Sequence, residues 1–308
     1  MRTRKWHSKA IELKQKGLSN YEIARQIFGK ASRESTLRYF FNQPNIKTQI
    51  DKIDTCKMLF WDIEITPYLS FHFDKWGVNI GNDYHVTEQY LISHAWSWGI
   101  DGEIQSGILT AEQAKNHDDY ALVEQAWSLL DEADVVVAHN GIKFDVRVMN
   151  GFFLRHGLPP PSPFKVIDTY RMAKRNFKLT SNSLKYLAKM LGVQQKLDSG
   201  GIEAWAGAYF GVQEDLDNME IYNKGDIETL RQVYLKLRSW GGSGVNLGMF
   251  SKHSAVCPYC ASDDIVIVED AHHVTTVSKF NVVHCGNCGG KSRLRKRDPH
   301  EVSVTPLR

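Results

Sequence analysis

Two carboxylates that lie two residues apart interrupt an apolar stretch, and they are well placed to hold a metal ion. The stretch is LFWDIEIT, residues 59–66, and its composition predicts a β-strand. Side chains alternate between the two faces of a strand, so Asp62 and Glu64 point to the same face. Like charges side by side need either water or a cation. An exposed edge strand with two solvated acids is the simpler alternative.

Two further motifs carry acids in positions where chemistry is common. The sequence HNGIKFD, residues 139–145, follows a fully apolar segment at 135–138 that predicts a buried strand. Asp145 then falls in the first turn of the next predicted helix, at a strand end where α/β proteins place their sites. Further on, Tyr222 and Asp226 lie four residues apart in a predicted helix. That spacing puts both side chains on one helical face.

The elements around these acids alternate between strand and helix. Strands are predicted at residues 90–100 and 104–109, and an amphipathic helix at 120–130. Further helices are predicted to begin at Asp168, to include residues 183–188, and to end before Gly241. Asp168 could contact substrate, but we expect it to cap its helix. The pattern predicts an α/β fold with a mixed sheet and helices on both faces.

Together, the three motifs resemble those of the DEDD superfamily of 3′-5′ exonucleases, in its tyrosine-bearing branch. The resemblance covers roughly residues 57–240, and Ile221 stands where the histidine branch would carry its histidine. It implies a ribonuclease H-like fold and two Mg²⁺ or Mn²⁺ ions. Hard cations of this kind prefer oxygen ligands, and two of them can clamp the attacking and leaving oxygens of a phosphodiester.

The resemblance also implies a role for each residue. Asp62 would bridge both ions, Glu64 and Asp226 would complete the site of the ion that activates water, and Asp145 would hold the other ion. Tyr222 would orient the attacking water, because a phenol with an ordinary pKa of about 10 is a poor base at neutral pH. The terminal nucleotide would be contacted by Ile65, Thr66 and Asn140.

The N-terminal part of the chain is basic. Residues 1–52 hold 12 Lys and Arg against 4 Asp and Glu, although the whole chain has a net charge of only +3. Apolar residues at helical spacing predict three helices over residues 8–42. Residues 17–41 resemble the helix-turn-helix modules of transcription regulators and transposases, so Arg33 and Arg38 are expected to face nucleic acid. A three-helix bundle used for protein contact is the alternative.

Four of the five cysteines form two Cys-x-x-Cys pairs near the C-terminus, which favours metal binding over disulfides. Four thiolates make a closed tetrahedral zinc site, and this segment resembles a zinc ribbon with one structural Zn²⁺. The predicted ligands are Cys257, Cys260, Cys285 and Cys288. A basic run at residues 291–297 follows them and suits phosphate contacts. A solvated tail is the alternative for that run.

An aromatic-rich segment, residues 67–77, directly follows the carboxylate strand. Aromatic side chains beside a catalytic strand could stack on unpaired bases. Such residues more often pack against their own domain, and we expect packing here.

The sequence therefore predicts a metal-dependent 3′-5′ exonuclease that hydrolyses nucleic acid, with DNA as the expected substrate. Glu64 and Tyr222 count against the alternative of a transposase- or resolvase-type endonuclease. The presence of every expected carboxylate counts against a DNA-binding regulator with an inactive nuclease fold. The predicted parts are a helix-turn-helix domain (1–45), a linker (46–56), the exonuclease domain (57–242), a linker (243–252), the zinc ribbon with its basic tail (253–298) and a final tail (299–308).

The expected cellular context follows from what the sequence lacks. No apolar run reaches 18 residues, and the basic N-terminus has no apolar signal core. We therefore expect a cytoplasmic protein without membrane contact. Its layout resembles proteins of bacteriophages and prophages, which favours a bacterial or phage-infected cell, with replication or recombination proteins as expected partners.

Overall fold

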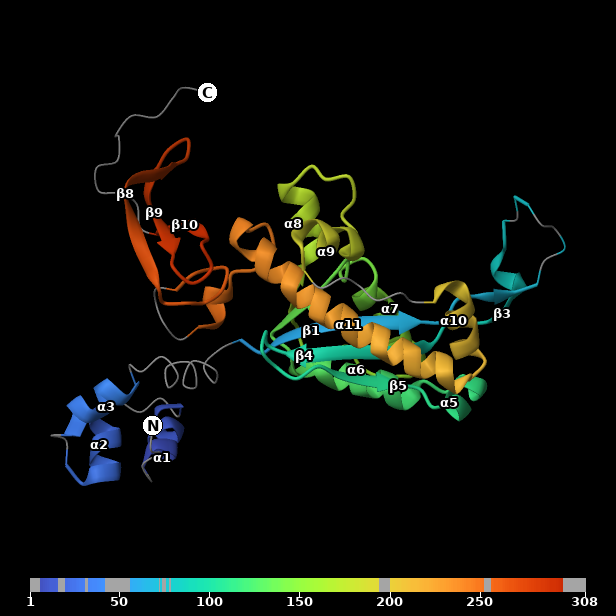
Figure 1. Ribbon diagram of the computed structural model, residues 1–308, viewed down its shortest axis with the longest axis horizontal. Coiled ribbons are helices and arrows are strands. Elements are labelled where there is room, and N and C mark those ends of the chain that lie inside the picture. Colours follow the sequence, from blue (N-terminus) through green and yellow to red (C-terminus); the bar gives the residue numbers. More distant parts are fainter. Residues whose placement is uncertain are drawn as a thin grey trace.

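A five-stranded mixed sheet forms the middle of the chain (Figure 1). The computed structural model describes residues 6–15, 20–30, 33–41, 56–71, 73, 76–77, 79–193, 200–251 and 256–295. The strands, in their spatial order, are β5 (Gln105–Ile108), β4 (Leu91–Trp98), β1 (Met58–Ile65), β6 (Val135–Ala138) and β7 (Lys165–Asp168). The central strand β1 is antiparallel to β4 and parallel to β6. The predicted mixed α/β sheet is confirmed.

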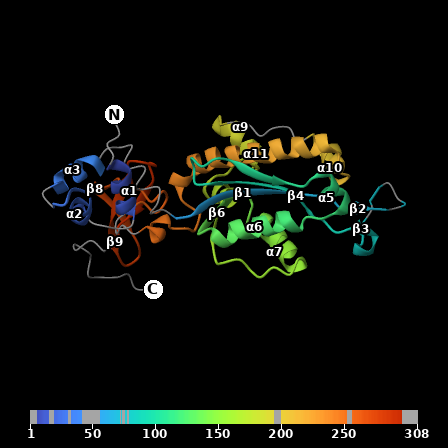
Figure 2. The same cartoon turned by 90° about the horizontal axis from the view of Figure 1, so that it is seen from below.

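Helices cover both faces of this sheet (Figure 2). They are α5 (Ala111–Asn116), α6 (Tyr120–Glu132), α7 (Asp145–Arg155), α8 (Thr169–Asn176), α9 (Leu184–Leu191), α10 (Gly201–Tyr209) and α11 (Gln213–Leu237). Trp61 and Ile63 of β1 belong to the core cluster that contains α6 and α7, whereas Phe60 belongs to the cluster that contains α8, α9 and α11. Side chains alternate along a strand, so Asp62 and Glu64 point to the same face of β1 as Phe60. Both therefore face α11.

The N-terminal part contains the three predicted helices. They are α1 (His7–Gln15), α2 (Asn20–Phe28) and α3 (Glu34–Phe41). Ile23, Leu37 and Phe40 are among the residues of their shared apolar core. Arg33 is exposed just before α3, and Arg38 lies within α3 with its side chain outside the described part of the structure. The helix-turn-helix assignment and its contact with DNA stay predictions.

The C-terminal module is a three-stranded antiparallel sheet, and the segment before its first strand contacts the central α/β domain. Its strands are β8 (Ile265–Val274), β9 (Lys279–Cys285) and β10 (Lys291–Arg293). Leu247 is buried in the cluster under α11, and its backbone N–H donates to the carbonyl of Pro258 at 2.9 Å. The Tyr234 hydroxyl of α11 donates to the carbonyl of Tyr259 at 3.5 Å. Residues 296–297 of the basic run lie outside the described residues.

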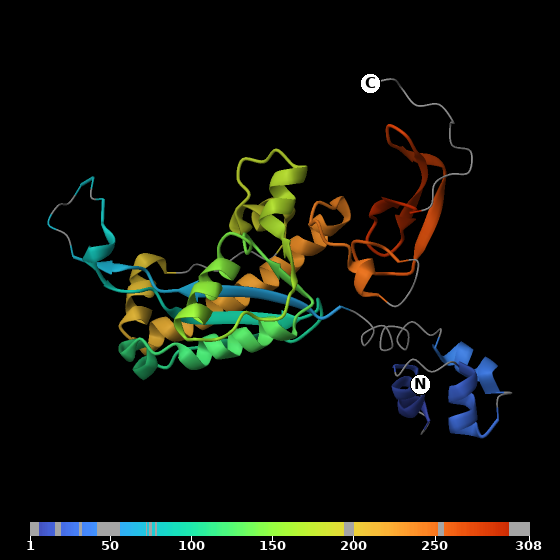
Figure 3. The same ribbon diagram turned by 180° about the vertical axis from the view of Figure 1, so that it is seen from behind.

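The aromatic segment after β1 is a projecting hairpin, not a packed loop. Its strands are β2 (Leu69–Ser70) and β3 (His85–Thr87), and it extends past α10 beyond the end of the sheet (Figures 1 and 3). Phe71 is 74% exposed and Phe73 is 105% exposed. The expected packing against the domain is therefore wrong, because the two short strands carry these rings away from the core.

Within the described ranges, none of the helices has the length and apolar character needed to cross a membrane.

Candidate active site

Three carboxylates meet between β1 and α11. Asp62, Glu64 and Asp226 each offer an oxygen, and these oxygens lie within 4.8 Å of one another. Asp226 is only 1% exposed, whereas the other two are half-buried. Negative charges held this closely repel one another unless a cation lies between them, and carboxylate oxygens suit Mg²⁺ or Mn²⁺. The residues present therefore fit a divalent metal ion.

Asn223 holds one of these carboxylates in place, and sequence reasoning missed it. Its side-chain amide donates to Asp62 Oδ2 at 2.8 Å, while its own oxygen accepts from the Ser93 hydroxyl at 3.0 Å. Asn223 is fully buried and lies three residues before Asp226 on the same helical face. The sequence shows Asn223 directly after Tyr222. Its partner Ser93 lies 130 residues away in sequence, so no local pattern pairs the two.

Replacing Asn223 with alanine is expected to lower kcat about 10- to 100-fold, the usual effect of removing a group that orients a metal ligand. The Asp62 carboxylate would lose a donor that fixes its orientation. Steady-state kinetics on a labelled oligonucleotide would measure the change, and Asn218→Ala, an exposed asparagine on the same helix, is the matched control. Equal kcat values for the parent and Asn223→Ala would contradict this role.

Tyr222 lies one helical turn before Asp226 and is fixed by a neighbouring helix. It is 7% exposed, and its ring meets the edge of Trp205 from α10 with the centroids 5.9 Å apart. Tyr222 and Asp226 thus lie one helical turn apart on α11, and the contact of the phenol with the site stays a prediction. The helix that supports it was not predicted.

Asp145 is buried against the site but is not one of the three clustered carboxylates. It begins α7 and is 2% exposed. Burial raises the pKa of its carboxyl to about 7, and the nearby charge of Asp168 adds to the rise, whereas hydrogen bonds from the backbone of Asp145 and Ile63 act in the opposite direction. The contact with Ile63 places Asp145 beside β1. A divalent cation nearby would favour its charged form.

Asp168 organises the loop that carries Asn140. Its carboxylate accepts from the backbone N–H of Arg171 at 3.1 Å, so the predicted helix cap is confirmed. It also accepts from the N–H groups of Asn140 at 3.0 Å and Ile142 at 3.3 Å. Asn140 has φ +67°, and a Cβ atom on Gly141 would lie 2.4 Å from Ala138 Cβ. This tight turn therefore requires glycine and depends on Asp168.

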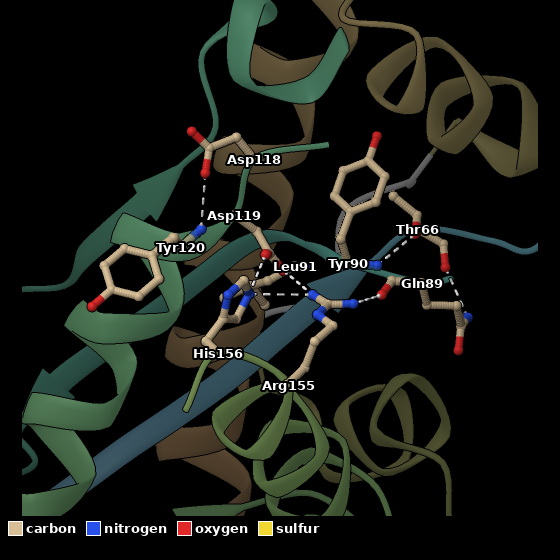
Figure 4. Close-up of polar contacts among 9 residues, drawn as sticks. All are labelled: Thr66, Gln89, Tyr90, Leu91, Asp118, Asp119, Tyr120, Arg155 and His156. Carbon is tan, nitrogen blue, oxygen red and sulfur yellow. Dashed lines mark hydrogen bonds and ion pairs between the residues drawn. The ribbon is translucent and has the colours of Figure 1, made fainter. Parts of the chain in front are cut away.

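A buried polar network holds the end of β1 (Figure 4). Asp119 is 1% exposed and accepts from the N–H of Leu91 at 2.9 Å and from Arg155 at 2.7 Å, while His156 lies 2.7 Å from its other oxygen. Arg155 also donates to the carbonyl of Gln89 at 2.7 Å. The Gln89 amide in turn donates to the carbonyl of Thr66 at 2.8 Å.

The polar groups of Thr66 are engaged within the protein. Its N–H donates to the carbonyl of Tyr90, and its hydroxyl accepts from the Tyr90 N–H, each at 3.0 Å. These two hydrogen bonds hold Thr66, directly after β1, against Tyr90. The substrate contacts expected of Ile65, Thr66 and Asn140 stay predictions.

His94 lies on β4 opposite Ile63 of the carboxylate strand and is fully buried. The Trp61 indole N–H donates to its Nδ1 at 3.4 Å, and its Nε2 lies 3.0 Å from the Gln125 side-chain oxygen. Burial lowers the pKa of His94 from 6.5 to about 4, although the bond to Gln125 opposes this. The folded protein therefore keeps this imidazole neutral.

Acid is expected to destabilise the protein through His94. Between pH 6.5 and 4 the unfolded chain binds a proton at this histidine and the folded chain does not, so the free energy of unfolding falls as the pH drops. The loss by pH 5 is on the order of 2 kcal/mol. Urea unfolding at pH 7 and pH 5 should show a smaller loss for His94→Gln than for the parent. The exposed His273→Gln should behave like the parent.

The four predicted zinc ligands lie together in the C-terminal module. Their sulfur atoms are all within 4.8 Å of one another, with Cys257 and Cys288 3.6 Å apart and Cys260 and Cys285 also 3.6 Å apart. Cys257 and Cys285 are buried, each 1% exposed. Four sulfurs in this arrangement fit a zinc ion.

The fold and the acidic site are those of a nuclease-like α/β protein. Residues 83–238, about half of the chain, match the family model RNase_H_2, which describes the RNase_H superfamily. The chain belongs to the RNase H superfamily. The match includes Asp145, Tyr222 and Asp226, whereas β1 with Asp62 and Glu64 lies before its first residue.

No curated protein matches the sequence. Among solved structures, the chain is similar to the family B DNA polymerase from the hyperthermophilic archaeon Pyrobaculum calidifontis, with 15% identity and a TM-score of 0.42. The similarity covers 61% of this chain but only 26% of the polymerase chain.

Proposed function

We propose that this protein is a metal-dependent 3′-5′ exonuclease that hydrolyses phosphodiester bonds of nucleic acid, with DNA as the expected substrate. The observation that carries the proposal is the cluster of Asp62, Glu64 and Asp226, whose oxygens lie within 4.8 Å of one another. Tyr222, one helical turn before Asp226, supports the tyrosine-bearing type. Membership of the RNase H superfamily supports nucleic-acid hydrolysis in general.

Some of these residues would hold metal ions, and others would orient the attacking water and the substrate. Asp62, Glu64 and Asp226 would hold divalent ions, with Asp145 as the additional ligand beside β1. Bound Mg²⁺ or Mn²⁺ would polarise the phosphate and supply hydroxide at neutral pH. The Tyr222 hydroxyl would hydrogen-bond the attacking water and fix its direction. The loop tied by Asp168 would present Asn140 to the terminal nucleotide.

The flanking parts would hold the nucleic acid. The exposed Arg33 before α3 and the basic composition of residues 1–52 suit a phosphate backbone. The four-cysteine module would bind one structural Zn²⁺. The hydrogen bond from the Tyr234 hydroxyl to the carbonyl of Tyr259 attaches it to α11, the helix that also carries Tyr222 and Asp226.

End-directed cutting separates this proposal from its rivals. The protein would be incubated with Mg²⁺ and with linear or circular single strands of DNA or RNA, and the linear strands would be labelled at the 5′ end. An exonuclease shortens the linear label progressively from the 3′ end and leaves circles intact. Cleavage of circles would favour a transposase- or resolvase-type endonuclease. Binding without cleavage of any strand would favour a DNA-binding regulator.

A further inference from the structure

We propose that the β2–β3 hairpin is a stacking platform for unpaired bases of the substrate strand. We call the hairpin rings Tyr68, Phe71, Phe73 and Tyr84 the aromatic platform. They are 52%, 74%, 105% and 59% exposed, respectively. This inference rests on the proposed function, because it assigns the same substrate a second contact outside the carboxylate cluster.

The platform lies next to the catalytic strand. Tyr68 follows Glu64 by four residues, and the hairpin leaves the sheet at the end to which β1 runs (Figures 1 and 3). In the proposed complex, the strand whose terminal phosphodiester reaches Asp62 and Glu64 runs past the end of β1. Nucleotides next to the cleaved bond therefore come within the neighbourhood of the hairpin.

The hairpin is held at its base, so its rings are presented by a supported element. Thr87 Oγ1 and the Tyr209 hydroxyl of α10 lie 2.6 Å apart. The Tyr68 ring stacks on His85 of β3, with the centroids 4.4 Å apart. Support at the base lowers the conformational entropy that the hairpin loses when a base stacks on it.

A cation lies at the base of the hairpin. A cavity of about 310 Å³ at the base of the hairpin is lined by Val86, Thr87, Lys115 and Phe210, among others. Lys115 is exposed, and Phe210 is 56% exposed. Exposed rings on the hairpin and a cation at its base suit a nucleic-acid strand, whose bases stack while its phosphates carry the charge.

Stacking should dominate over charge in this contact. Asp83 and Glu88 are exposed on and beside the hairpin, and such acids oppose a purely electrostatic contact with phosphates. The contribution of the platform should therefore survive added salt, which weakens phosphate contacts strongly. This behaviour distinguishes it from binding by the basic N-terminal part.

Binding would be measured with the whole 308-residue chain carrying Asp226→Ala, so that the strand is not cut. The probes are single-stranded DNA and RNA oligonucleotides with 2-aminopurine near the 3′ end, whose fluorescence falls on stacking. The double variant Phe71→Ala/Phe73→Ala is expected to weaken binding at least about tenfold at high salt and to lose the fluorescence decrease. Tyr84→Ala should act in the same direction. The exposed Leu154→Ala on α7 is the control and should match the parent.

The outcomes separate this inference from the proposed function. If the chain with native Asp226 hydrolyses the strand while the hairpin variants keep their affinity and fluorescence change, the platform is wrong and the exonuclease stands. Variants that bind DNA and RNA normally but lose a protein partner would also overturn it. If the parent neither hydrolyses nor binds any strand, the proposed function fails first. An unchanged circular dichroism spectrum would show that the variants are folded.

Discussion

Asp226→Ala is expected to lower hydrolysis at least about 10³-fold, because the metal site would lose its most buried ligand and metal-supplied stabilisation contributes several kcal/mol. The fold should survive. Removing one of three mutually repelling carboxylates relieves charge repulsion in the metal-free protein. Turnover of a labelled oligonucleotide would measure the loss, and Asp62→Ala should act in the same way while leaving binding through the flanking parts largely intact.

The role of Asp226 in binding metal can be tested without measuring hydrolysis. Excess Mg²⁺ should raise the thermal midpoint of the parent, because a ligand that binds only the folded state stabilises it. The midpoint of Asp226→Ala should respond much less. Asp217→Ala removes an exposed carboxylate from the same helix and should keep both activity and the Mg²⁺ response. Full activity of Asp226→Ala would remove this residue from the catalytic site.

Cys257→Ser is expected to abolish zinc binding and to unfold the C-terminal module. Within the described residues 256–295, the buried apolar side chains are few, with Phe280 and Val283 among them. Such a module depends on its metal, since zinc binding supplies about 10–16 kcal/mol in small zinc domains. Zinc content should fall from one ion per chain to none, and limited proteolysis should cut within residues 256–295.

Cys56→Ser is the matched control for this loss. Cys56 lies outside the four-sulfur cluster, and burial raises the pKa of its thiol to about 12, with a further rise from Asp134. The control should keep its zinc and its resistance to protease. A parent protein without zinc whose C-terminal module nevertheless resists protease would show that the four cysteines have another role.

Local patterns predicted the elements that carry the site. Alternation along residues 59–66 placed Asp62 and Glu64 on one face, and helical spacing placed Tyr222 with Asp226. The observed boundaries differ from the predicted ones by one or two residues. The strand predicted at 59–66 is β1, Met58–Ile65, and the helix predicted at 120–130 is α6, which ends at Glu132. These features depend on neighbours in sequence, and hydrophobic periodicity reports on such neighbours.

Contacts between distant parts of the chain could not be predicted in the same way. The bond from Asn223 to Asp62 spans 161 residues, and the bond from Arg155 to Gln89 spans 66. Trp205 supports Tyr222 from a helix whose pattern was too weak to recognise. The exposure of Phe71 depends on where its hairpin leaves the sheet, and no local pattern encodes that direction.

The most direct test of the central claim is the metal requirement of strand shortening. A 5′-labelled single strand would be followed over time with zinc-loaded protein, with Mg²⁺ or Mn²⁺ added or omitted, so that the zinc site stays filled throughout. The three-carboxylate site predicts a ladder that shortens from the 3′ end only when the divalent ion is present. Equal shortening without added Mg²⁺ or Mn²⁺, or no shortening with either ion, would contradict the assignment of Asp62, Glu64 and Asp226 as the catalytic metal site.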